Sequence, residues 1–296
     1  MGYFQVIFAT LIWGSYGLFV RHLEYPPELI LFFRYLLGFL FLFVLAYRTK
    51  KLLWTEAIRH WRKFILIGAF SASSWYAYTF SLTYTSVANA VFLLYTAPCF
   101  VIIFSPFLLK EKVEKNAILA LMVSLLGMTI IMKGSGMAFS ANSWVGDTIS
   151  LASGLFYALS MIMIKKLPSH LLGITVNMYV ACTACMFCLP MAARHMHLIQ
   201  VKDFSLLIAL GILQQGVATT LYYAALRHIK ITHASILTYL DPVFSVFFAF
   251  IFLQEIIGLS TLVGGLVVLL GGIIIVNSSA KDEVGSKTAA LNTTKD

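Results

Sequence analysis

Two charged side chains lie inside long apolar runs of this sequence, where an ionised group is energetically unfavourable. Asp241 lies about ten residues into one run, and Arg34 lies about five residues into another. A charge at the centre of a bilayer costs on the order of 2.5–3.5 kcal/mol on insertion scales. Residues of this kind mark proton relays and binding sites for charged groups, so both are candidate functional residues.

Asp241 is consistent with two roles. Removal from water raises the pKa of a carboxyl group, so this side chain could exchange a proton or pair with a substrate amine. Alternatively, it caps backbone groups beside Pro242. Arg34 likewise has two interpretations. Its guanidinium could bind a carboxylate through two parallel hydrogen bonds, or its long stem could carry the charge to the lipid head groups.

Polar and aromatic residues recur at helical spacing in two further runs. Ser71, Ser74, Trp75 and Tyr78 are separated by steps of three and four, which places them on one helix face. At an offset of 144 residues, the second run carries a matching face of Gln215, Thr219 and Tyr222. Such faces either join helices by hydrogen bonds or line a wet cavity, and both interpretations stay open.

Directly after each of these faces comes a segment that the chain carries twice. Residues 82–132 align without a gap to residues 226–276, and 15 of the 51 aligned positions are identical. The shared motif is a tyrosine followed three residues later by a proline: Tyr95 with Pro98, and Tyr239 with Pro242. Because a proline inside a helix removes one backbone hydrogen bond, each motif predicts a hinge or a static kink.

The composition predicts a membrane protein. Hydrophobic residues make up 60% of the chain and charged residues 11%, against about 25% charged residues in soluble domains. Ten apolar runs approach the roughly 20 residues that span a bilayer. They are 3–21, 29–47, 64–84, 87–109, 116–133, 145–165, 172–193, 205–226, 231–253 and 258–277. The first run reads as a signal anchor without a cleavage site, and no soluble domain is left over.

The distribution of Lys and Arg between the runs predicts the topology. Of the 21 basic residues, 16 lie in one alternate set of loops and the tail, 4 in the other set, and Arg34 lies inside a run. Because basic loops stay on the cytoplasmic side, both termini are expected there. A five-span unit used twice must then cross the membrane in opposite senses, as in transporters with inverted repeats.

We therefore expect an all-α polytopic membrane protein of ten transmembrane helices, arranged as two inverted five-helix repeats. The boundaries are 3–133 for the first repeat and 145–277 for the second. Residues 278–296 are polar and are predicted to form a disordered cytoplasmic tail. Gly127 and its counterpart Gly271 indicate close helix packing, either within a monomer or in a homodimer.

No pattern for metal, cofactor or nucleic-acid binding stands out. Cys182, Cys185 and Cys188 are spaced like iron–sulfur ligands, but steps of three drift around a helix, so we interpret them as small apolar residues. The histidines lack metal-ligand spacing. The net charge of +9 follows from the loops and not from a nucleic-acid surface. We predict no cofactor, no metal and no nucleic-acid partner.

The motifs taken together resemble one known family. Trp13-Gly14, Phe33-Arg34-Tyr35, and the repeated order of tyrosine, proline, Glu111 or Glu255, and glycine are similar to the EamA family of the drug/metabolite transporter superfamily. The resemblance covers residues 3–277. It implies two inverted five-helix units around a central cavity. It also implies export of amino acids or other small metabolites, whereas more distant members carry nucleotide sugars or phosphorylated sugars. The family arginine falls on Arg34, and an acid frequent before the second proline falls on Asp241. Met178 replaces the arginine in the second unit.

We predict a secondary transporter that moves a small organic solute, an amino acid or a related metabolite, out across the cytoplasmic membrane by alternating access, with protons as a candidate coupling ion. The expected substrate-binding residues are Trp13, Arg34, Trp75, Tyr78, Tyr95, Tyr157, Gln215, Thr219, Tyr222, Tyr239 and Asp241, with Pro98 and Pro242 as hinges. An exchanger of phosphorylated sugars is the alternative, although Arg34 is the one intramembrane cation. A membrane enzyme is a weaker alternative, because Asp147 and Glu255 belong to different helices and no motif joins them.

Overall fold

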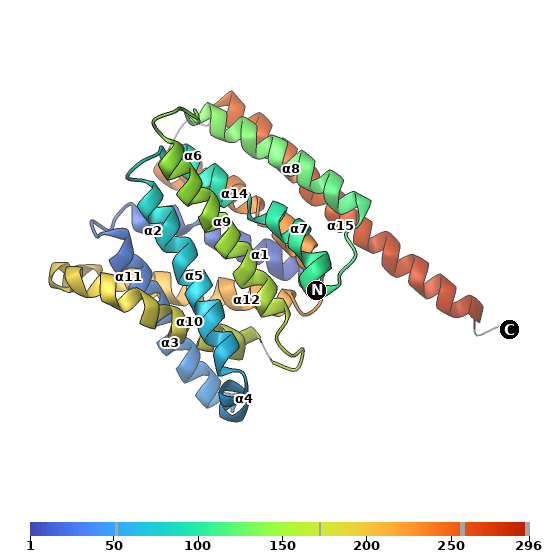
Figure 1. Cartoon of the computed structure of the whole chain (residues 1–296), viewed down its shortest axis with the longest axis horizontal. Helices are drawn as coiled ribbons and strands as arrows, with labels where there is room; N and C mark the ends of the chain where they lie inside the picture. Colours follow the sequence, from blue (N-terminus) through green and yellow to red (C-terminus); the bar gives the residue numbers. More distant parts are fainter. Residues whose placement is uncertain (51–52, 172, 255–257, 294–296) are drawn as a thin grey trace.

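The chain folds into a bundle of helices, seen in a computed structural model (Figure 1). The structure describes residues 1–50, 53–171, 173–254 and 258–293, with side chains as far as residue 278. No strand occurs among these residues. In chain order the helices are α1 (Gly2–Gly14), α2 (Tyr16–Val20), α3 (Pro27–Arg48), α4 (Trp54–Arg59), α5 (Trp61–Ser81), α6 (Val87–Leu94), α7 (Ala97–Leu109), α8 (Lys115–Gly134), α9 (Trp144–Lys165), α10 (Gly173–Ala192), η1 (Ala193–Leu198), η2 (Val201–Asp203), α11 (Phe204–Ala209), η3 (Leu210–Ala218), α12 (Thr219–Ala225), α13 (Ile231–Leu237), α14 (Leu240–Leu253) and α15 (Leu259–Thr293).

Nine helical segments of the described chain are long and apolar enough to cross a membrane. They coincide with nine of the ten runs expected from the sequence. The remaining run falls on α5, a helix of 21 residues that carries the serines of the polar face and is not among the nine. α5 packs along α9 and α10 inside the bundle. The protein is therefore an all-helical, multi-pass membrane protein.

Two spans are interrupted at matching positions. α6 ends at Leu94 and α7 begins at Ala97, whereas α13 ends at Leu237 and α14 begins at Leu240. At the two breaks, the amide of Thr96 donates to the carbonyl of Leu93, and the amide of Tyr239 donates to the carbonyl of Ile236. These bonds span three residues and tighten the chain locally. The breaks precede the two prolines, each of which opens the second half of its span.

The same two spans end alike. Lys110 closes α7 with φ of 58°, and Gln254 closes α14 with φ of 55°. Both residues adopt the left-handed conformation that commonly ends a helix, although neither is a glycine. Lys110 and Gln254 are 144 residues apart. The repeat seen in the sequence therefore extends to backbone conformation at both the break and the end of these spans.

α8 and α15 pack side by side along their lengths (Figure 1). A Cβ atom added to Gly127 would lie 2.6 Å from the carbonyl oxygen of Gly264, and one added to Gly264 would lie 2.6 Å from the carbonyl oxygen of Gly127. A Cβ added to Gly271 would lie 2.1 Å from the hydroxyl of Ser124. These glycines therefore serve close packing within one chain. α15 continues as a helix to Thr293, where composition predicts a disordered tail. Ala and Lys are strong helix formers, and extension of an existing helix needs no new nucleus.

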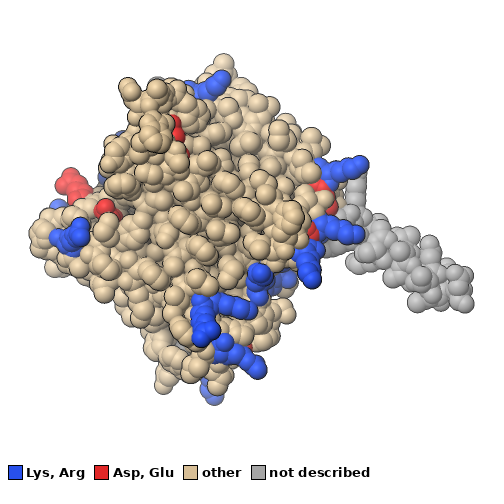
Figure 2. All heavy atoms as spheres, in the orientation of Figure 1, with Lys and Arg blue, Asp and Glu red and all other residues tan. Residues whose placement is uncertain are grey.

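One end of the bundle carries most of the basic side chains, and we call it the basic end. It contains 12 of the 21 basic residues: Arg48, Lys50, Arg59, Arg62, Lys63, Lys110, Lys112, Lys115, Lys165, Lys166, Arg227 and Lys230. Figure 2 shows Lys and Arg along the lower right of the molecule, whereas the broad face in view has few charged groups. This separation fits a belt of lipid-facing apolar surface with a charged rim.

Ion pairs tie several loops together at the basic end. The ammonium of Lys165 lies 3.7 Å from Glu111, and Lys230 pairs with Glu114. Nε2 of His233 lies 3.3 Å from Oε2 of Glu114, and the hydroxyl of Tyr3 lies 2.5 Å from Nδ1 of the same ring. Glu111 is thus paired with a residue far along the chain. Glu255 lies outside the described residues.

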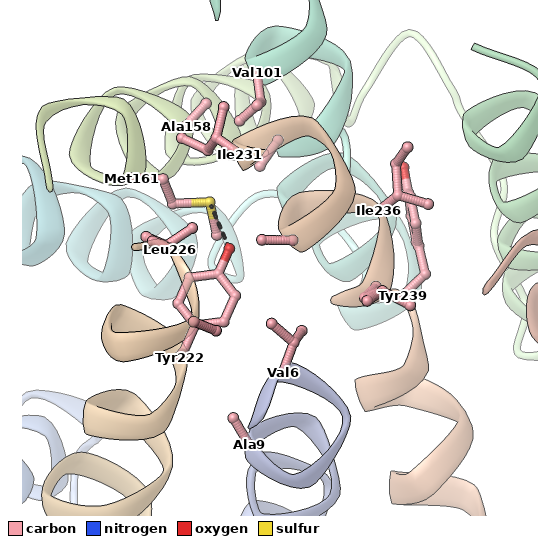
Figure 3. Packing of buried hydrophobic residues seen from close by; sticks show 14 of the residues in the cluster. Val6, Ala9, Val101, Ala158, Met161, Tyr222, Leu226, Ile231, Ile236 and Tyr239 are labelled. Carbon is pink, nitrogen blue, oxygen red and sulfur yellow. Dashed lines mark hydrogen bonds between the residues drawn. The ribbon is translucent and has the colours of Figure 1, made fainter. Parts of the chain in front are cut away.

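Part of a large buried apolar cluster lies on the side of the cavity nearest the basic end. It includes Val6 and Ala9 of α1, Ile231 of α13, and Met161 of α9 beside Tyr222 of α12, as Figure 3 shows. The hydroxyl of Tyr222 donates to the sulfur of Met161 at 3.4 Å. This part of the cluster joins helices from the start, middle and end of the sequence and closes the cavity on the side of the basic end. We call this closed side the floor of the cavity.

Candidate binding cavity

The bundle encloses a cavity of about 670 Å3 at its centre, within the 300–1,000 Å3 of small-molecule sites. Twelve of the thirteen residues expected from the sequence line it: Trp13, Arg34, Trp75, Tyr78, Tyr95, Pro98, Tyr157, Gln215, Thr219, Tyr222, Asp241 and Pro242. They come from α1, α3, α5, α6–α7, α9, η3–α12 and α13–α14. The cavity is therefore built by both halves of the chain.

Tyr239 is the exception. It does not line the cavity, and its side chain is fully buried. Its ring stacks on the ring of Tyr95, with centroids 6.2 Å apart. The expectation that Tyr239 forms part of the cavity wall is wrong, because Tyr95 lies between it and the cavity. Tyr239 instead supports the residue that does face the open space.

The cavity extends to one end of the bundle. Its lining includes Val87 at the start of α6, Ser135 after α8, and Gly258 and Thr261 at the start of α15. All of these lie at the end of the bundle opposite the basic end. In the other direction, the cavity stops at Met161, Ile164 and Tyr222, which belong to the apolar cluster of the floor. The described structure therefore opens away from the basic end.

Arg34 does not extend toward the surface. It is 7% exposed, and its guanidinium carbon lies 5.5 Å from the ring centre of Tyr16 and 5.3 Å from that of Trp75. These distances fit cation–π contacts on two rings. Within the described residues no hydrogen-bond acceptor or carboxylate pairs with the guanidinium, and its Nε atom is buried without a partner. The structure therefore excludes the snorkelling interpretation.

Asp241 is held by a residue of the other half. The hydroxyl of Tyr95 donates to Oδ2 of Asp241 at 2.7 Å. Asp241 lies in the first turn of α14, where the amides of the helix start favour a carboxylate. Its own amide donates to the carbonyl of Thr238 at 3.0 Å. The side chain nevertheless remains part of the cavity lining, so the carboxylate has both a fixed position and access to a bound solute.

A second set of contacts holds the start of the chain against η3. The indole of Trp13 stacks at an angle on Tyr222, with ring centres 5.2 Å apart, and donates to the carbonyl of Gln214 at 3.3 Å. The amide nitrogen of Gln214 donates to the carbonyl of Ile12 at 2.7 Å and to the hydroxyl of Ser15 at 3.1 Å. Ser15 lies at the break between α1 and α2, so Gln214 stabilises that break.

Gln215 lines the cavity, but its amide is engaged elsewhere. Its nitrogen donates to Oδ1 of Asn177 at 2.7 Å, and the amide nitrogen of Asn177 donates to the carbonyl of Gln215 at 2.6 Å. Asn177 also donates to the hydroxyl of Thr220 at 2.9 Å. Gln215 therefore joins α10 to η3 through this reciprocal pair. Mainly the CH2 groups of its side chain remain to line the cavity.

The hinge prolines occupy the first turns of α7 and α14. A proline is tolerated in the first turn, where its missing amide would have no helical partner. The interruption therefore lies before each proline, at Tyr95 and Tyr239, and not at the proline itself. Both breaks border the cavity, because Tyr95 and Thr238 belong to its lining.

With this geometry in view, comparison with known proteins decides the family. The sequence model of the EamA-like transporter family matches residues 1–133 and, a second time, residues 144–277. The chain belongs to this family.

Relatives of this EamA chain are named as transporters. One from Archaeoglobus fulgidus, an uncharacterized transporter, is 25% identical over 271 residues, which cover 89% of this chain and 93% of the relative. The pseudopaline exporter CntI of Pseudomonas aeruginosa strain UCBPP-PA14 is 24% identical over 247 residues, which cover 83% of this chain and 84% of that protein. A crystal structure superposes with a TM-score of 0.81 at 15% identity, covering 93% of this chain and 96% of the other, and shows the same fold.

Several lining residues of the EamA chain were not predicted. They include Tyr16, Tyr35, Ser160, Gln214, Tyr223 and Thr238. Repeat symmetry offered a signal for some of them, since Tyr16 and Ser160 occupy the same place in α2 and α9, 144 residues apart. Met178, the counterpart of Arg34, is instead buried beside Leu42 and Ala46. The cationic position is therefore supplied by the first half alone.

Among the described residues, no group of three or more His, Cys, Asp or Glu side chains is arranged to hold a metal ion. Cys182, Cys185 and Cys188 are free thiols on α10. Cys188 is packed with the apolar residues of α3, in agreement with its interpretation as a small apolar residue.

Proposed function

We propose that this protein is a secondary transporter that carries a small organic solute, an amino acid or a related metabolite, across the cytoplasmic membrane by alternating access. The observation that carries this proposal is the central cavity, which both halves line and which contains one cation, Arg34, and one carboxylate, Asp241, among its described residues. A buried polar cavity within a membrane bundle is expensive unless it serves a solute. Family membership supports transport over catalysis.

The pattern of helix contacts supports two inverted five-helix repeats. α5 packs on α9 and α10, and its counterpart, α11 to α12 with η3, packs on α1 and α3. α6 and α7 pack on α9, as α14 packs on α1. The pairs α3 with α10 and α8 with α15 relate each half to its own counterpart. Counting α5 as a span gives ten transmembrane helices, which fits repeats at 3–133 and 145–277.

The positive-inside rule orients this arrangement. The basic end carries most Lys and Arg residues (Figure 2), so we place it, and both chain termini, on the cytoplasmic side. The cavity then faces outward, and the apolar cluster with the ion pairs of Glu111 and Glu114 closes the cytoplasmic side. Alternating access requires this floor to open while the outer end closes.

We further propose export as the direction and protons as the coupling ion. Export is supported by a relative that is named as an exporter. Asp241 is the one carboxylate among the described lining residues, so it is the candidate to take up and release a proton. A phosphorylated substrate fits this cavity less well, because a phosphate carries about two charges and Arg34 is the only cation of the described lining.

Counterflow in liposomes tests the proposed function. The purified full chain is reconstituted with a high internal concentration of one unlabelled amino acid, and uptake of the same labelled amino acid is followed for each of the standard amino acids. We expect transient accumulation of at least one of them, because a carrier exchanges internal for external solute without net energy input. Absence of counterflow with amino acids, amines and organic acids alike would exclude a carrier of small solutes.

A further inference from the structure

Arg34 is a buried charge whose counterion is missing from the described protein. It is 7% exposed, and no described carboxylate or other acceptor pairs with its guanidinium. An isolated buried charge is strongly unfavourable unless it is paired and hydrogen-bonded. The guanidinium also belongs to the cavity lining. The missing counterion of Arg34 is therefore an anion that reaches the guanidinium through the cavity.

The aromatic contacts determine which kind of anion fits. Tyr16 and Trp75 approach the guanidinium at 5.5 and 5.3 Å from their ring centres. Contacts with the π-faces of these rings leave N–H groups at the edge of the guanidinium. Those N–H groups form a planar fork that matches a carboxylate. The rings of Tyr16 and Trp75 are tilted by 44° relative to each other, so they do not enclose the guanidinium between two parallel faces.

Asp241 supplies the opposite charge in the same cavity. The hydroxyl of Tyr95 holds Oδ2 at 2.7 Å, whereas no described side chain bonds Oδ1. Asp241 and Arg34 both line the cavity, yet they form no ion pair within the described residues. The cavity therefore contains two separated opposite charges and no other charged group of the described lining.

We propose that this cavity binds the zwitterionic head group of an amino acid, with the carboxylate at Arg34 and the ammonium group at Asp241. This inference rests on the proposed function and names the groups that recognise the solute. A solute with one positive and one negative group balances both poles. A simple amine or a simple acid leaves one buried charge unpaired. The aromatic walls of Trp13, Trp75 and Tyr78 then contact the side chain of the amino acid.

Ligand pairs test the proposal on the unaltered protein. Binding of each standard L-amino acid to the full chain in detergent is measured by calorimetry, and the tightest one is compared with its α-amide and its N-acetyl derivative. The amide lacks the carboxylate charge, and the N-acetyl derivative lacks the ammonium charge. We expect each derivative to bind at least about tenfold more weakly, as loss of one charge-assisted hydrogen bond predicts. Equal binding of either derivative, or no binding of any amino acid, would overturn the proposal.

Two variants assign the poles. In Arg34→Gln, the amino acid should bind at least about tenfold more weakly while its α-amide binds as it does to the wild type. In Asp241→Asn, the amino acid should bind more weakly, whereas its N-acetyl derivative should bind as it does to the wild type. Arg194→Gln, an exposed arginine of η1, is the matched control and should alter neither ligand. If Arg34→Gln is not recovered folded, the ligand pairs on the wild type still decide.

Failure of this inference is distinguishable from failure of the proposed function. If counterflow occurs with an amine such as spermidine or an acid such as succinate but with no amino acid, the protein is a carrier and the zwitterion site is refuted. If the wild type binds an amino acid with the expected loss for both derivatives but shows no counterflow, the site stands and carrier function is refuted.

Discussion

The hydroxyl of Tyr95 and the carboxylate of Asp241 form a hydrogen bond of 2.7 Å between residues that are 146 positions apart. Tyr95 lies at the break of the fourth span, and Asp241 lies in the first helical turn after the break of its counterpart. The two interrupted spans therefore meet through one polar contact at the cavity wall. Several consequences of this arrangement can be measured.

Removal of the Tyr95 hydroxyl should weaken solute binding. In Tyr95→Phe the carboxylate of Asp241 loses the hydrogen bond from the tyrosine hydroxyl. A hydrogen bond with one charged partner contributes about 1.5–3 kcal/mol. We expect the KM of counterflow to rise at least about tenfold, with an unchanged amount of protein in the membrane. Tyr239→Phe is the control from the matching repeat position, since Tyr239 does not line the cavity. An equal rise of KM in both variants would show that the effect comes from packing.

Asp241→Asn should affect the dependence of transport on a proton gradient. The amide keeps the shape of the side chain but cannot take up and release a proton. We expect uptake in proteoliposomes to fall at least about tenfold, and the remaining uptake to lose its dependence on pH. Glu24→Gln, an exposed carboxylate before α3, should leave both properties intact. Proton coupling through Asp241 is ruled out if the variant retains the wild-type pH profile.

Substitution of Gly127 should loosen the contact between α8 and α15. An added Cβ would lie 2.6 Å from the carbonyl oxygen of Gly264 and 2.7 Å from the amide of Val268, both of which are backbone atoms that cannot rotate away. Overpacking of this kind costs about 1–3 kcal/mol, so Gly127→Ala should lower Tm by at least about 3 °C. Gly265→Ala is the control on α15, because its nearest neighbour would be Val243 at 3.9 Å. Equal Tm values for the two variants would contradict this packing.

The ion pair of Glu114 should contribute to stability in a pH-dependent way. Burial acts to raise the pKa of Glu114, but the hydrogen bond from Lys230 and the nearby charges of His233 and Lys230 outweigh it, so the pKa lies below its usual 4.5. A carboxyl whose folded pKa is depressed stabilises the protein above its unfolded pKa, and this stabilisation is lost as the pH falls through the folded pKa.

Glu114→Gln should therefore lower Tm by about 2–4 °C at pH 7, and the difference from the wild type should shrink as the pH falls below about 4. Lys112→Met, which removes an exposed charge from the same loop, should change Tm little at either pH. A Tm difference for Glu114→Gln that persists at low pH would show that the side chain acts by packing and not by charge.

Much of the fold is readable from the sequence because a bilayer demands long apolar helices. Nine of the ten expected runs meet that demand in the structure, and the offset of 144 residues predicts which helices are counterparts. The exact positions of the helix breaks are harder to predict from the sequence. The Tyr-x-x-Pro motifs predict an interruption at the proline, but a proline suits the first turn of a helix, so each break lies upstream at the tyrosine.

The cavity lining shows where periodicity fails. Gln215 was predicted and Gln214 was not, yet Gln214 bonds Ile12 and Ser15 while Gln215 is paired with Asn177. Both lie in η3, a π-helix from Leu210 to Ala218, in which residues do not follow the spacing of 3.6 per turn. Tyr239 was misassigned for another reason. Repeat symmetry predicts equivalent positions, but two stacked rings cannot both face the same space.

The seam of glycines between α8 and α15 has a mechanical consequence. Because main chain rests on main chain where Gly127 and Gly264 face one another, these two helices cannot easily slide past each other at that point. They form a fixed spine, and any rocking of the bundle must be carried by the helices around the cavity. A substitution along this spine should therefore slow the turnover of the carrier before it alters which solute is chosen.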